Sequence, residues 1–536
     1  MYYNIIIKGG IQLHIEEIRL INFKQFKEEK IVFNKERNIL IGENGVGKTS
    51  ILRAISYVLN ASESSIRDIG LQSLFNTDTI NDFMNGTKQY QNLPILEVEL
   101  FLSEDIKNFK INGIHNSKGK TLNGLKMMIV PNDDFSQEIL ESLEKTTVFP
   151  FDFYKLQFLT FSDTSYNSYN RYMRYTLIDS TKINSQHATK KFIEKVYNNR
   201  TNVDKRQRIK YAYRVHSEQF SKQFSNEFNP NDLGDELYQV TLDSRRENAL
   251  EENLTIHNDD VDIWNMGQGD TVFINTDFAL SNTSENTQIV LLEEPENHLS
   301  YLNMHKLIKK VKESKDKQTF IATHSNMISS RLDLSNAIFL TNSTATKLSS
   351  LSDDTADFFR KSPDNNILNF ILSDKAILVE GDAEYILLDS IYRKQNSREM
   401  YEDNITLISC NGLSFKRYLE IAQLLNKKVA VITDNDSDYL KNIKEKYSDF
   451  FSERIEVFAP EDNELSTFEI ALYEDNEGFL NKHLYKPQMV NGVLEYMLNN
   501  KAEAAYRLLK KLESDVDIYK EFSVPIYINE AFEWIK

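Results

Sequence analysis

The chain has little cysteine, no long apolar run and a deficit of positive charge. Its single cysteine, Cys410, excludes an intramolecular disulfide, which suits a reducing cytosol. No apolar run approaches the ~20 residues that a membrane span needs. The N-terminal Met1–Asn4 lacks the basic start and the apolar core of a secretory leader. We therefore expect a cytoplasmic protein that makes no membrane contact.

Acidic side chains outnumber basic ones, 80 to 63, so the formal net charge is −17. This balance argues against a protein that coats nucleic acid through bulk charge, although it leaves room for a local basic groove. It also fits a site that concentrates carboxylates around metal ions. The apolar content is 40%, but 32 Phe and 26 Tyr can fill large cores. A length of 536 residues predicts two or three domains.

A glycine-rich stretch near the N-terminus matches the P-loop pattern G-x-x-x-x-G-K-[ST] from Gly42 to Thr49. The apolar run Asn38–Ile41 before it predicts a buried strand, and Ser50–Ile55 after it predicts the start of a helix. Phosphate would then lie at the helix N-terminus, where the dipole favours anions. A chance glycine loop is the alternative, and the flanking elements argue against it. The predicted nucleotide-binding residues are Gly42, Asn44, Gly45, Gly47, Lys48, Thr49 and Ser50.

Residue types in this loop suit the chemistry of ATP. The glycines let backbone N–H groups approach the β-phosphate without a Cβ clash. Lys48 supplies a cation for the β- and γ-phosphates, and the hydroxyl of Thr49 is a ligand for Mg²⁺. Alternating apolar residues predict strands within Leu13–Phe33 and Pro94–Leu102, which suggest the edge of a nucleotide-binding α/β domain.

The polar segment from about Ser185 to Phe228 shows helical spacing and predicts a helical insertion. A helical hairpin is one form that the insertion could take, and dimerisation is one role for it. Its cations are candidates for DNA contact, but charge runs more often mark a solvated helix face or a subunit contact. These cations are Lys190, Lys191, Lys205, Arg206, Arg208, Lys210 and Arg214.

Two further strands continue the ATP-site pattern. Gln288–Leu292 ends in a run of carboxylates, of which Glu293 is predicted to coordinate Mg²⁺ and Glu294 to polarise the attacking water. Acidic pairs after a strand are common, but this one follows a P-loop. Thr319–Ser325 predicts the next strand, and His324 at its end is placed to sense the γ-phosphate.

Together these pieces resemble the ABC ATPase class of RecF and SMC-like proteins. In that class, a glycine-rich signature from one subunit caps the ATP of the other, which implies a homo-oligomer. Gly267 and Gly269 occupy the corresponding place upstream of Glu293. The chain departs from the class pattern, since Met266 stands where a serine is usual and Glu293 where an aspartate is usual. The resemblance therefore implies ATP binding more firmly than brisk hydrolysis.

The C-terminal third predicts a second site at the ends of buried strands. Strands are expected at 376–379, 405–408, 428–433 and 455–458. In a parallel sheet their carboxyl ends converge on one crevice. Carboxylates crowded there are costly unless cations join them, and hard oxygen ligands select Mg²⁺, Mn²⁺ or Ca²⁺. The alternative is a set of solvated acidic loops. The predicted metal ligands are Glu380, Glu384, Asp434, Asp436 and Glu469.

The spacing Glu-Gly-x-x-Glu followed by Asp-x-Asp resembles the Toprim domain. A RecF-like ATPase joined to Toprim resembles the OLD (overcoming lysogenisation defect) family of nucleases. The resemblance implies that two metals per Toprim site cut DNA, with Glu380, Asp434 and Asp436 as central ligands and Lys501 supporting catalysis. Family members act in antiphage defence, among them the Gabija nuclease subunit and retron-linked effectors. A separate helicase-like protein or a retron RNA–protein complex is therefore an expected type of partner.

We thus expect an α/β protein with an ABC-type ATPase domain, a helical insertion and a Toprim domain. The expected division is 1–184 and 231–365 for the ATPase, 185–230 for the insertion and 366–536 for Toprim, with the polar stretch Leu340–Asn366 as a boundary. The expected function is ATP-regulated, metal-dependent DNA endonuclease activity. An SMC-like ATPase without nuclease activity and a topoisomerase- or primase-like enzyme are the alternatives.

Overall fold

The computed structural model describes most of the chain, in segments. These are residues 13–104, 108–180, 186–224, 227, 250–258, 260–281, 287–341, 344–362, 366–410, 415–487, 491–514 and 519–536. Residues 1–12 and 411–414 are among those outside these segments. The chain divides into two compact units, of which the second comprises Ile41–Val46 and His324–Lys536 and the first the remainder. The domain limits expected from the sequence stay predictions.

The first unit contains a six-stranded antiparallel sheet, and the expected N-terminal strands are part of it. Its order is β2-β1-β4-β6-β5, with β7 also paired to β6. Successive side chains of a strand point to opposite faces, but β4 is buried along nearly all of its length, so both of its faces are covered. The strands are β1 (Ile15–Phe23), β2 (Phe26–Val32), β4 (Leu96–Leu102), β5 (Asn112–Gly113), β6 (Leu122–Pro131) and β7 (Tyr154–Thr160).

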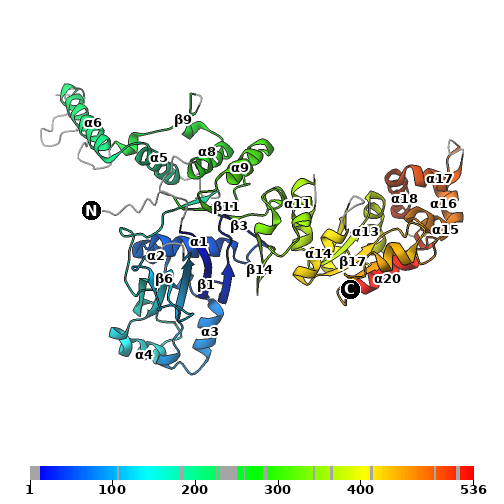
Figure 1. Ribbon diagram of the computed structural model, residues 1–536, viewed down its shortest axis with the longest axis horizontal. Helices are drawn as coiled ribbons and strands as arrows, with labels where there is room; N and C mark the ends of the chain where they lie inside the picture. Colours follow the sequence, from blue (N-terminus) through cyan, green and yellow to red (C-terminus); the bar gives the residue numbers. More distant parts are fainter. Residues whose placement is uncertain are drawn as a thin grey trace. The chain divides into compact units, whose positions relative to one another are not determined.

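Parallel strands in the same unit present the predicted ATP-site residues. Strand β12 pairs with β3 on one side and with β11 on the other, and β11 pairs in turn with β8. These strands read as continuous apolar runs because both faces of a parallel sheet are covered. Helix α1 follows the P-loop and packs on the sheets (Figure 1). The elements are β3 (Arg37–Gly42), α1 (Lys48–Asn60), β8 (Tyr175–Asp179), β11 (Ile289–Glu293) and β12 (Gln318–Ala322).

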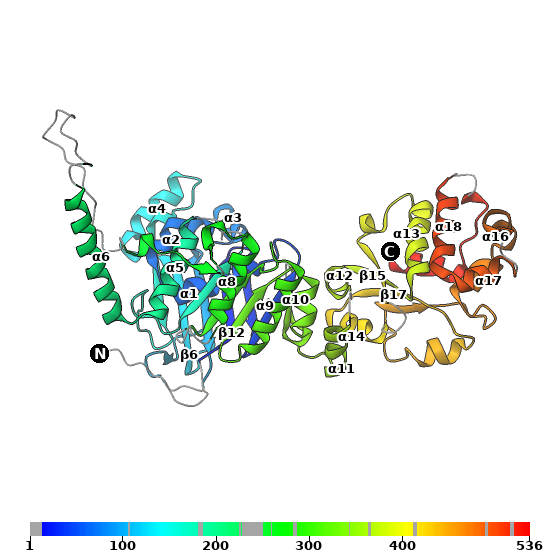
Figure 2. The same ribbon diagram turned by 90° about the horizontal axis from the view of Figure 1, so that it is seen from above.

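The expected helical insertion contains α5 (Gln186–Arg200) and α6 (Val203–Gln223). Helix α6 buries none of its described side chains, and both views show it extending away from α5 and α8 (Figures 1 and 2). The other elements of the unit are α2 (Glu63–Ile69), α3 (Thr77–Asn85), α4 (Ser136–Lys145), β9 (His257–Asn258), β10 (Val261–Asp262), α8 (Gln268–Leu280) and α9 (Tyr301–Glu313).

The polar stretch Leu340–Asn366 is more structured than its composition suggests. It contains α11 (Asp353–Lys361), whose Phe359 is fully buried, so part of this stretch contributes to a core, while the domain boundary expected here stays a prediction. Polar residues here make caps: Ser352 accepts a hydrogen bond from the Thr355 N–H, and its own hydroxyl donates to Glu420. Neighbouring elements are α10 (Asn326–Arg331), β13 (Ala337–Leu340), β14 (Ala345–Lys347) and α12 (Ile367–Leu372).

The C-terminal part of the second unit is built on a four-stranded parallel sheet of order β16-β15-β17-β18. All four strands expected from the sequence are present: β15 (Lys375–Val379), β16 (Ile405–Ser409), β17 (Lys428–Ile432) and β18 (Ile455–Phe458). The helices of this part are α13 (Asp382–Asn396), α14 (Phe415–Leu425), α15 (Phe468–Glu474), α16 (Glu477–Leu484), α17 (Gly492–Asn499), α18 (Lys501–Ser514) and α20 (Ile526–Ile535).

Among the helices in the described segments, none has the length and apolar character required to cross a membrane.

A buried glutamine connects the two sheets of the first unit. The Gln318 side chain accepts from the Ile15 N–H at 2.8 Å and donates to the carbonyl oxygens of Ile15 and Asn34 at 2.7 and 2.8 Å. Gln318→Leu leaves these backbone groups without that partner, and should lower the free energy of unfolding by about 2–4 kcal/mol. Denaturant unfolding measures the loss. Gln207→Leu on the exposed face of α6 is the control, and equal losses in both variants would contradict this role for Gln318.

Candidate functional site

Two adjacent strands deliver carboxylates to one edge of the C-terminal sheet. Strands β15 and β17 pair in parallel with Val379 opposite Ile432, and Glu380 and Asp434 follow these strands. The hydroxyl of Thr433 donates to Glu380 Oε2 at 3.3 Å. The parallel pairing therefore brings together two acidic side chains that are 54 positions apart in the sequence.

Helix N-termini complete the site. The carboxylate of Glu384, in the first turn of α13, accepts a hydrogen bond from the Gly381 N–H at 3.2 Å. Asp434 Oδ1 accepts from the Phe468 N–H at 2.7 Å, at the start of α15. Negative charge is favoured at both places because the N–H groups and the dipole of the helix point toward it. The acidic cleft is therefore held by backbone donors as well as by the sheet.

Lys501, at the first position of α18, supplies the cation of this site. Its Nζ lies 2.9 Å from Glu469 Oε2, and the Glu469 side chain is only 3% exposed. Burial alone would lower the pKa of Lys501, but the hydrogen bond to Glu469 and the nearby carboxylates outweigh it and raise that pKa. The structure thus places the lysine expected from a short sequence match beside the expected acidic residues.

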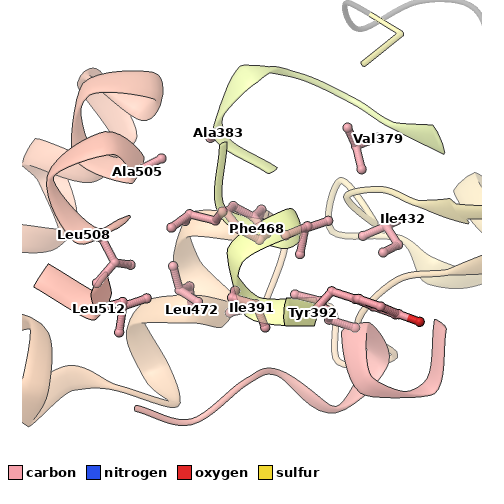
Figure 3. Close-up of a cluster of buried hydrophobic side chains, with 14 of the residues drawn as sticks. Val379, Ala383, Ile391, Tyr392, Ile432, Phe468, Leu472, Ala505, Leu508 and Leu512 are labelled. Carbon is pink, nitrogen blue, oxygen red and sulfur yellow. The ribbon is translucent and has the colours of Figure 1, made fainter. Parts of the chain in front are cut away.

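A hydrophobic cluster beneath the cleft positions these polar side chains (Figure 3). Its members include direct chain neighbours of the acidic residues: Val379 precedes Glu380, Ala383 precedes Glu384 and Phe468 precedes Glu469. Ala505, one turn beyond Lys501, belongs to the same cluster. Because close-packed interiors resist displacement, burial of these neighbours holds the strand end and the three helix starts together.

The cleft raises the proton affinity of two carboxyl groups. Burial, together with the charges of Glu469 and Glu380, raises the pKa of Glu384 to about 7. Burial, followed by the charges of Glu380 and Glu384, raises the pKa of Asp434 to about 7. Lys501 works against both shifts without cancelling them. The negative charge of the site therefore exceeds what its own lysine neutralises.

The predicted site residues do not all line the cleft. Its volume is about 320 Å³, and it is lined by Glu380, Gly381, Asp382, Ala383, Glu384, Asp434, Lys501 and Ala502. Asp436 is exposed on the loop after β17 and is not among these lining residues, and Glu469 lies buried behind Lys501.

Sequence reasoning missed a buried tyrosine near the site. Tyr527, on the C-terminal helix α20, is close enough to Asp434, Glu384 and Glu469 for these charges, after burial itself, to raise its pKa. No motif marked it, because it stands in an apolar helical pattern that indicates only a core position.

The donor chemistry of the cleft fits a divalent cation, although its side chains are not arranged around one. Carboxylate oxygens are the ligands that Mg²⁺, Mn²⁺ and Ca²⁺ prefer, and a cation would relieve the repulsion that, after burial, raises the two pKa values. Within the described segments, no group of three or more His, Cys, Asp or Glu side chains could hold a metal ion. Mg²⁺ can be held by one or two carboxylates, with water filling its remaining positions.

The P-loop has the backbone conformation that its glycines predict. Gly47 has φ 108° and directly precedes α1, and a Cβ there would collide with the side chain of Gln25. Lys48 is buried and Thr49 is exposed. The N-cap residue of α1 is Gly47, which has no side chain to accept from the first N–H groups, so this helix N-terminus suits phosphate oxygens.

The carboxylate predicted to bind Mg²⁺ at the ATP site already has a cationic neighbour. Glu293 Oε2 lies 3.2 Å from Arg53 Nη2, and the same nitrogen is paired with Asp179 Oδ2. Glu294 has a left-handed backbone with φ 45°, and its Oε2 accepts from Asn297 Nδ2 at 2.9 Å. Sequence reasoning missed Arg53 and Asp179. The position of Asp179 at the end of an apolar strand was the available signal.

The glycine signature packs directly on the segment that follows Glu294. Gly267 precedes α8, and a Cβ at Gly269 would collide with the carbonyl oxygen of His298. Asn303 Nδ2 donates to Asp270 Oδ1 at 3.2 Å. The sequence predicted His324 at the end of the strand, whereas β12 ends at Ala322 and His324 lies two residues beyond it.

Two family models match the chain. The AAA ATPase domain model matches residues 14–328, and the Overcoming lysogenization defect protein-like TOPRIM domain model matches residues 371–436. Similar curated proteins include the DNA replication and repair protein RecF of Clostridium kluyveri, 31% identical over 29% of this chain and 41% of the relative. RecF of Lysinibacillus sphaericus is 34% identical over 20% of this chain and 28% of the relative. The chain thus spans less than half the length of these relatives.

Solved structures with a similar fold include an SMC head bound to the C-terminal winged-helix domain of ScpA, with a TM-score of 0.36 and 16% identity over 63% of this chain and all of that one. The C-terminal region of the Burkholderia pseudomallei OLD protein gives a TM-score of 0.24 and 20% identity, over 30% of this chain and 97% of that one.

Raised carboxyl pKa values predict that metal-free stability falls with pH. The folded protein keeps a proton on Asp434 up to about pH 7, whereas the unfolded chain releases it near the ordinary aspartate pKa of 3.8. The free energy of unfolding should therefore decline through this window and stay low above it. Asp434→Asn removes the charge but keeps an oxygen acceptor for the Phe468 N–H. It should stabilise the protein in EDTA at pH 8 by on the order of 2 kcal/mol.

Denaturant unfolding from pH 4 to pH 8 in EDTA measures this difference, which should shrink toward pH 4. Glu461→Gln, at an exposed position of the same unit, is the control. An Asp434→Asn effect that is the same at both ends of the pH range would show that the charge of Asp434 is not its cause.

Proposed function

Because the chain belongs to the AAA ATPase domain family and joins that domain to an OLD-like Toprim domain, the combination of the OLD family, we propose that it is an ATP-regulated, divalent-metal-dependent DNA endonuclease. The observation that carries this proposal is the acidic cleft, where Glu380, Glu384 and Asp434 meet Lys501. DNA is the proposed substrate, in keeping with the DNA replication and repair proteins among the relatives.

The residues of the cleft are proposed to have different roles in phosphodiester cleavage. Glu380, Glu384 and Asp434 would hold divalent cations, with Asp436 and Glu469 as the further ligands of a two-metal site. Bound metal supplies an activated water and stabilises the leaving oxygen. Lys501 offsets charge on the scissile phosphate. Its contact with Glu469 at 2.9 Å fixes the position of its ammonium group before substrate arrives, which lowers the cost of reorganisation.

ATP is proposed to act as a switch more than as fuel. Lys48 and Thr49 would bind the nucleotide with Mg²⁺, Glu293 would coordinate that ion, and Glu294 would orient water. The signature glycines of a second copy would cap the nucleotide, which makes a homo-oligomer part of the proposal. His324 would contact the γ-phosphate. An ATP-dependent change in the spacing of two heads would then alter the attached Toprim sites, because a ligand shifts an equilibrium by its differential affinity for two states.

We further propose a cytoplasmic role in antiphage defence, together with a partner encoded separately. The OLD-like Toprim domain behind an ATPase domain supports this proposal. Purified protein incubated with supercoiled plasmid, with and without Mg²⁺ and ATP, tests the nuclease activity directly. Absence of nicking under every condition would favour an ATPase without nuclease activity.

Lys501→Ala should slow plasmid nicking by about 100-fold, the usual size of an electrostatic contribution to a transition state, while DNA affinity stays nearly unchanged. Gel-based nicking rates and a DNA-binding titration at the same Mg²⁺ concentration separate the two effects. The matched control is Lys511→Ala, an exposed lysine on the same helix α18. Equal rates for wild type and Lys501→Ala would assign the catalytic cation to another residue.

Lys48→Ala should abolish ATP binding and, with it, the nucleotide dependence of nicking, because the variant loses the cation that contacts the β- and γ-phosphates. Its metal-dependent nicking without nucleotide should persist. The measurement is a titration of ATP and of a non-hydrolysable analogue against the nicking rate of both proteins. If ATP leaves wild-type nicking unchanged across the titration, ATP does not regulate the Toprim site.

A further inference from the structure

Two buried carboxylates stand side by side at the ATP site, and only one of them belongs to the predicted motif. Strands β8 and β11 pair in parallel with Asp179 directly opposite Glu293. The Asp179 and Glu293 side chains are 9% and 8% exposed. Like charges placed so closely in a poorly hydrated setting repel each other unless a cation joins them.

The backbone around this pair is firmly connected. The Ser180 N–H donates to the Glu293 carbonyl at 3.3 Å, and the Ser180 hydroxyl donates to the carbonyl oxygens of Glu293 and Glu294 at 3.1 and 2.6 Å. The end of β8 is thereby attached to the end of β11 and to the residue after it. These hydrogen bonds keep together the two backbone segments that carry the carboxylates.

Arg53 provides the joining cation. Its Nη2 contacts Asp179 Oδ2 and lies 3.2 Å from Glu293 Oε2, and its side chain is 19% exposed. Arg53 stands on α1, the helix that begins at the P-loop, five positions after Lys48. The planar guanidinium can engage two carboxylates at once, which an ammonium group does less well. Its attachment to α1 keeps this positive charge close to the place where nucleotide phosphates would bind.

We propose that Arg53 and Asp179 are positioning residues that set the divalent-cation requirement of the ATP site. Arg53 contacts the Glu293 carboxylate through its Oε2, so the guanidinium and a divalent cation on this carboxylate would compete for its negative charge. Asp179 provides the second partner to which Arg53 stays attached when it leaves Glu293. Removing Arg53 therefore favours binding of the divalent cation to Glu293. Neutralising Asp179 leaves Arg53 bound to Glu293 alone and so disfavours binding of the cation. This inference concerns the ATP site and does not rest on the proposed nuclease activity.

The test is the binding of a fluorescent ATP analogue to the full chain over a series of Mg²⁺ concentrations, with an EDTA sample for metal-independent binding. Arg53→Gln should lower the Mg²⁺ concentration for half-maximal binding by about tenfold, the size expected when one charged hydrogen bond is lost. Asp179→Asn should raise it by a similar factor. Since Asp179 acts through Arg53, the double variant should behave like Arg53→Gln, a non-additive result that independent contributions would not produce.

Arg53→Lys carries the same test if Arg53→Gln does not fold, and its Mg²⁺ requirement should lie between those of wild type and Arg53→Gln. Arg67→Gln is the matched control, because Arg67 forms an exposed ion pair with Glu63 at 2.7 Å on α2. The proposal is overturned if the Arg53 and Asp179 variants shift the Mg²⁺ requirement in the same direction. It is also overturned if they change analogue binding equally with Mg²⁺ and in EDTA, as a purely structural role would.

Discussion

Repulsion between buried carboxylates is the constraint on which both sites of this protein depend. In each unit, adjacent parallel strands end in acidic side chains, and their register places the carboxylates next to one another. A helix places a cation beside the carboxylates of each site, Arg53 at the ATP site and Lys501 at the Toprim cleft. These two side chains partly offset the energetic cost of gathering negative charge. The negative charge that they do not neutralise favours binding of a divalent cation.

Arg53 and Lys501 differ in burial and in the number of carboxylates that they contact. Arg53 bridges two carboxylates and lies mostly buried on the helix that follows the P-loop, so it competes with a divalent cation for the charge of Glu293. Lys501 is half-exposed at the start of α18 and contacts the buried Glu469, which leaves the other cleft carboxylates with raised pKa values. The first arrangement suits regulation by nucleotide and Mg²⁺. The second suits a cleft that receives metal and a phosphodiester from solvent.

Apolar packing holds the Toprim cleft in shape, in addition to the polar contacts made by its carboxylates. The residues that precede Glu380, Glu384 and Glu469 all belong to one hydrophobic cluster, which also receives α18 and α20 (Figure 3). A cluster made of apolar side chains gives no sign in the sequence of which polar residues it will bring together. The nearness of Tyr527 to Asp434 follows from this packing, since α20 contacts β17.

Local patterns in the sequence determined most of the strands, the P-loop and the acidic strand ends, because strand alternation, glycine conformations and the turn after a buried strand depend on near neighbours. They also indicated Lys501, although only through a resemblance. The tertiary structure decided what local patterns cannot contain: the register that sets Asp179 opposite Glu293, the reach of Arg53 to both, and the exposure of Asp436 outside the cleft lining. It also decided that Leu340–Asn366 contains a buried helix face. These features arise from contacts between residues far apart in the chain, whose energies depend on distance and burial rather than on residue type alone.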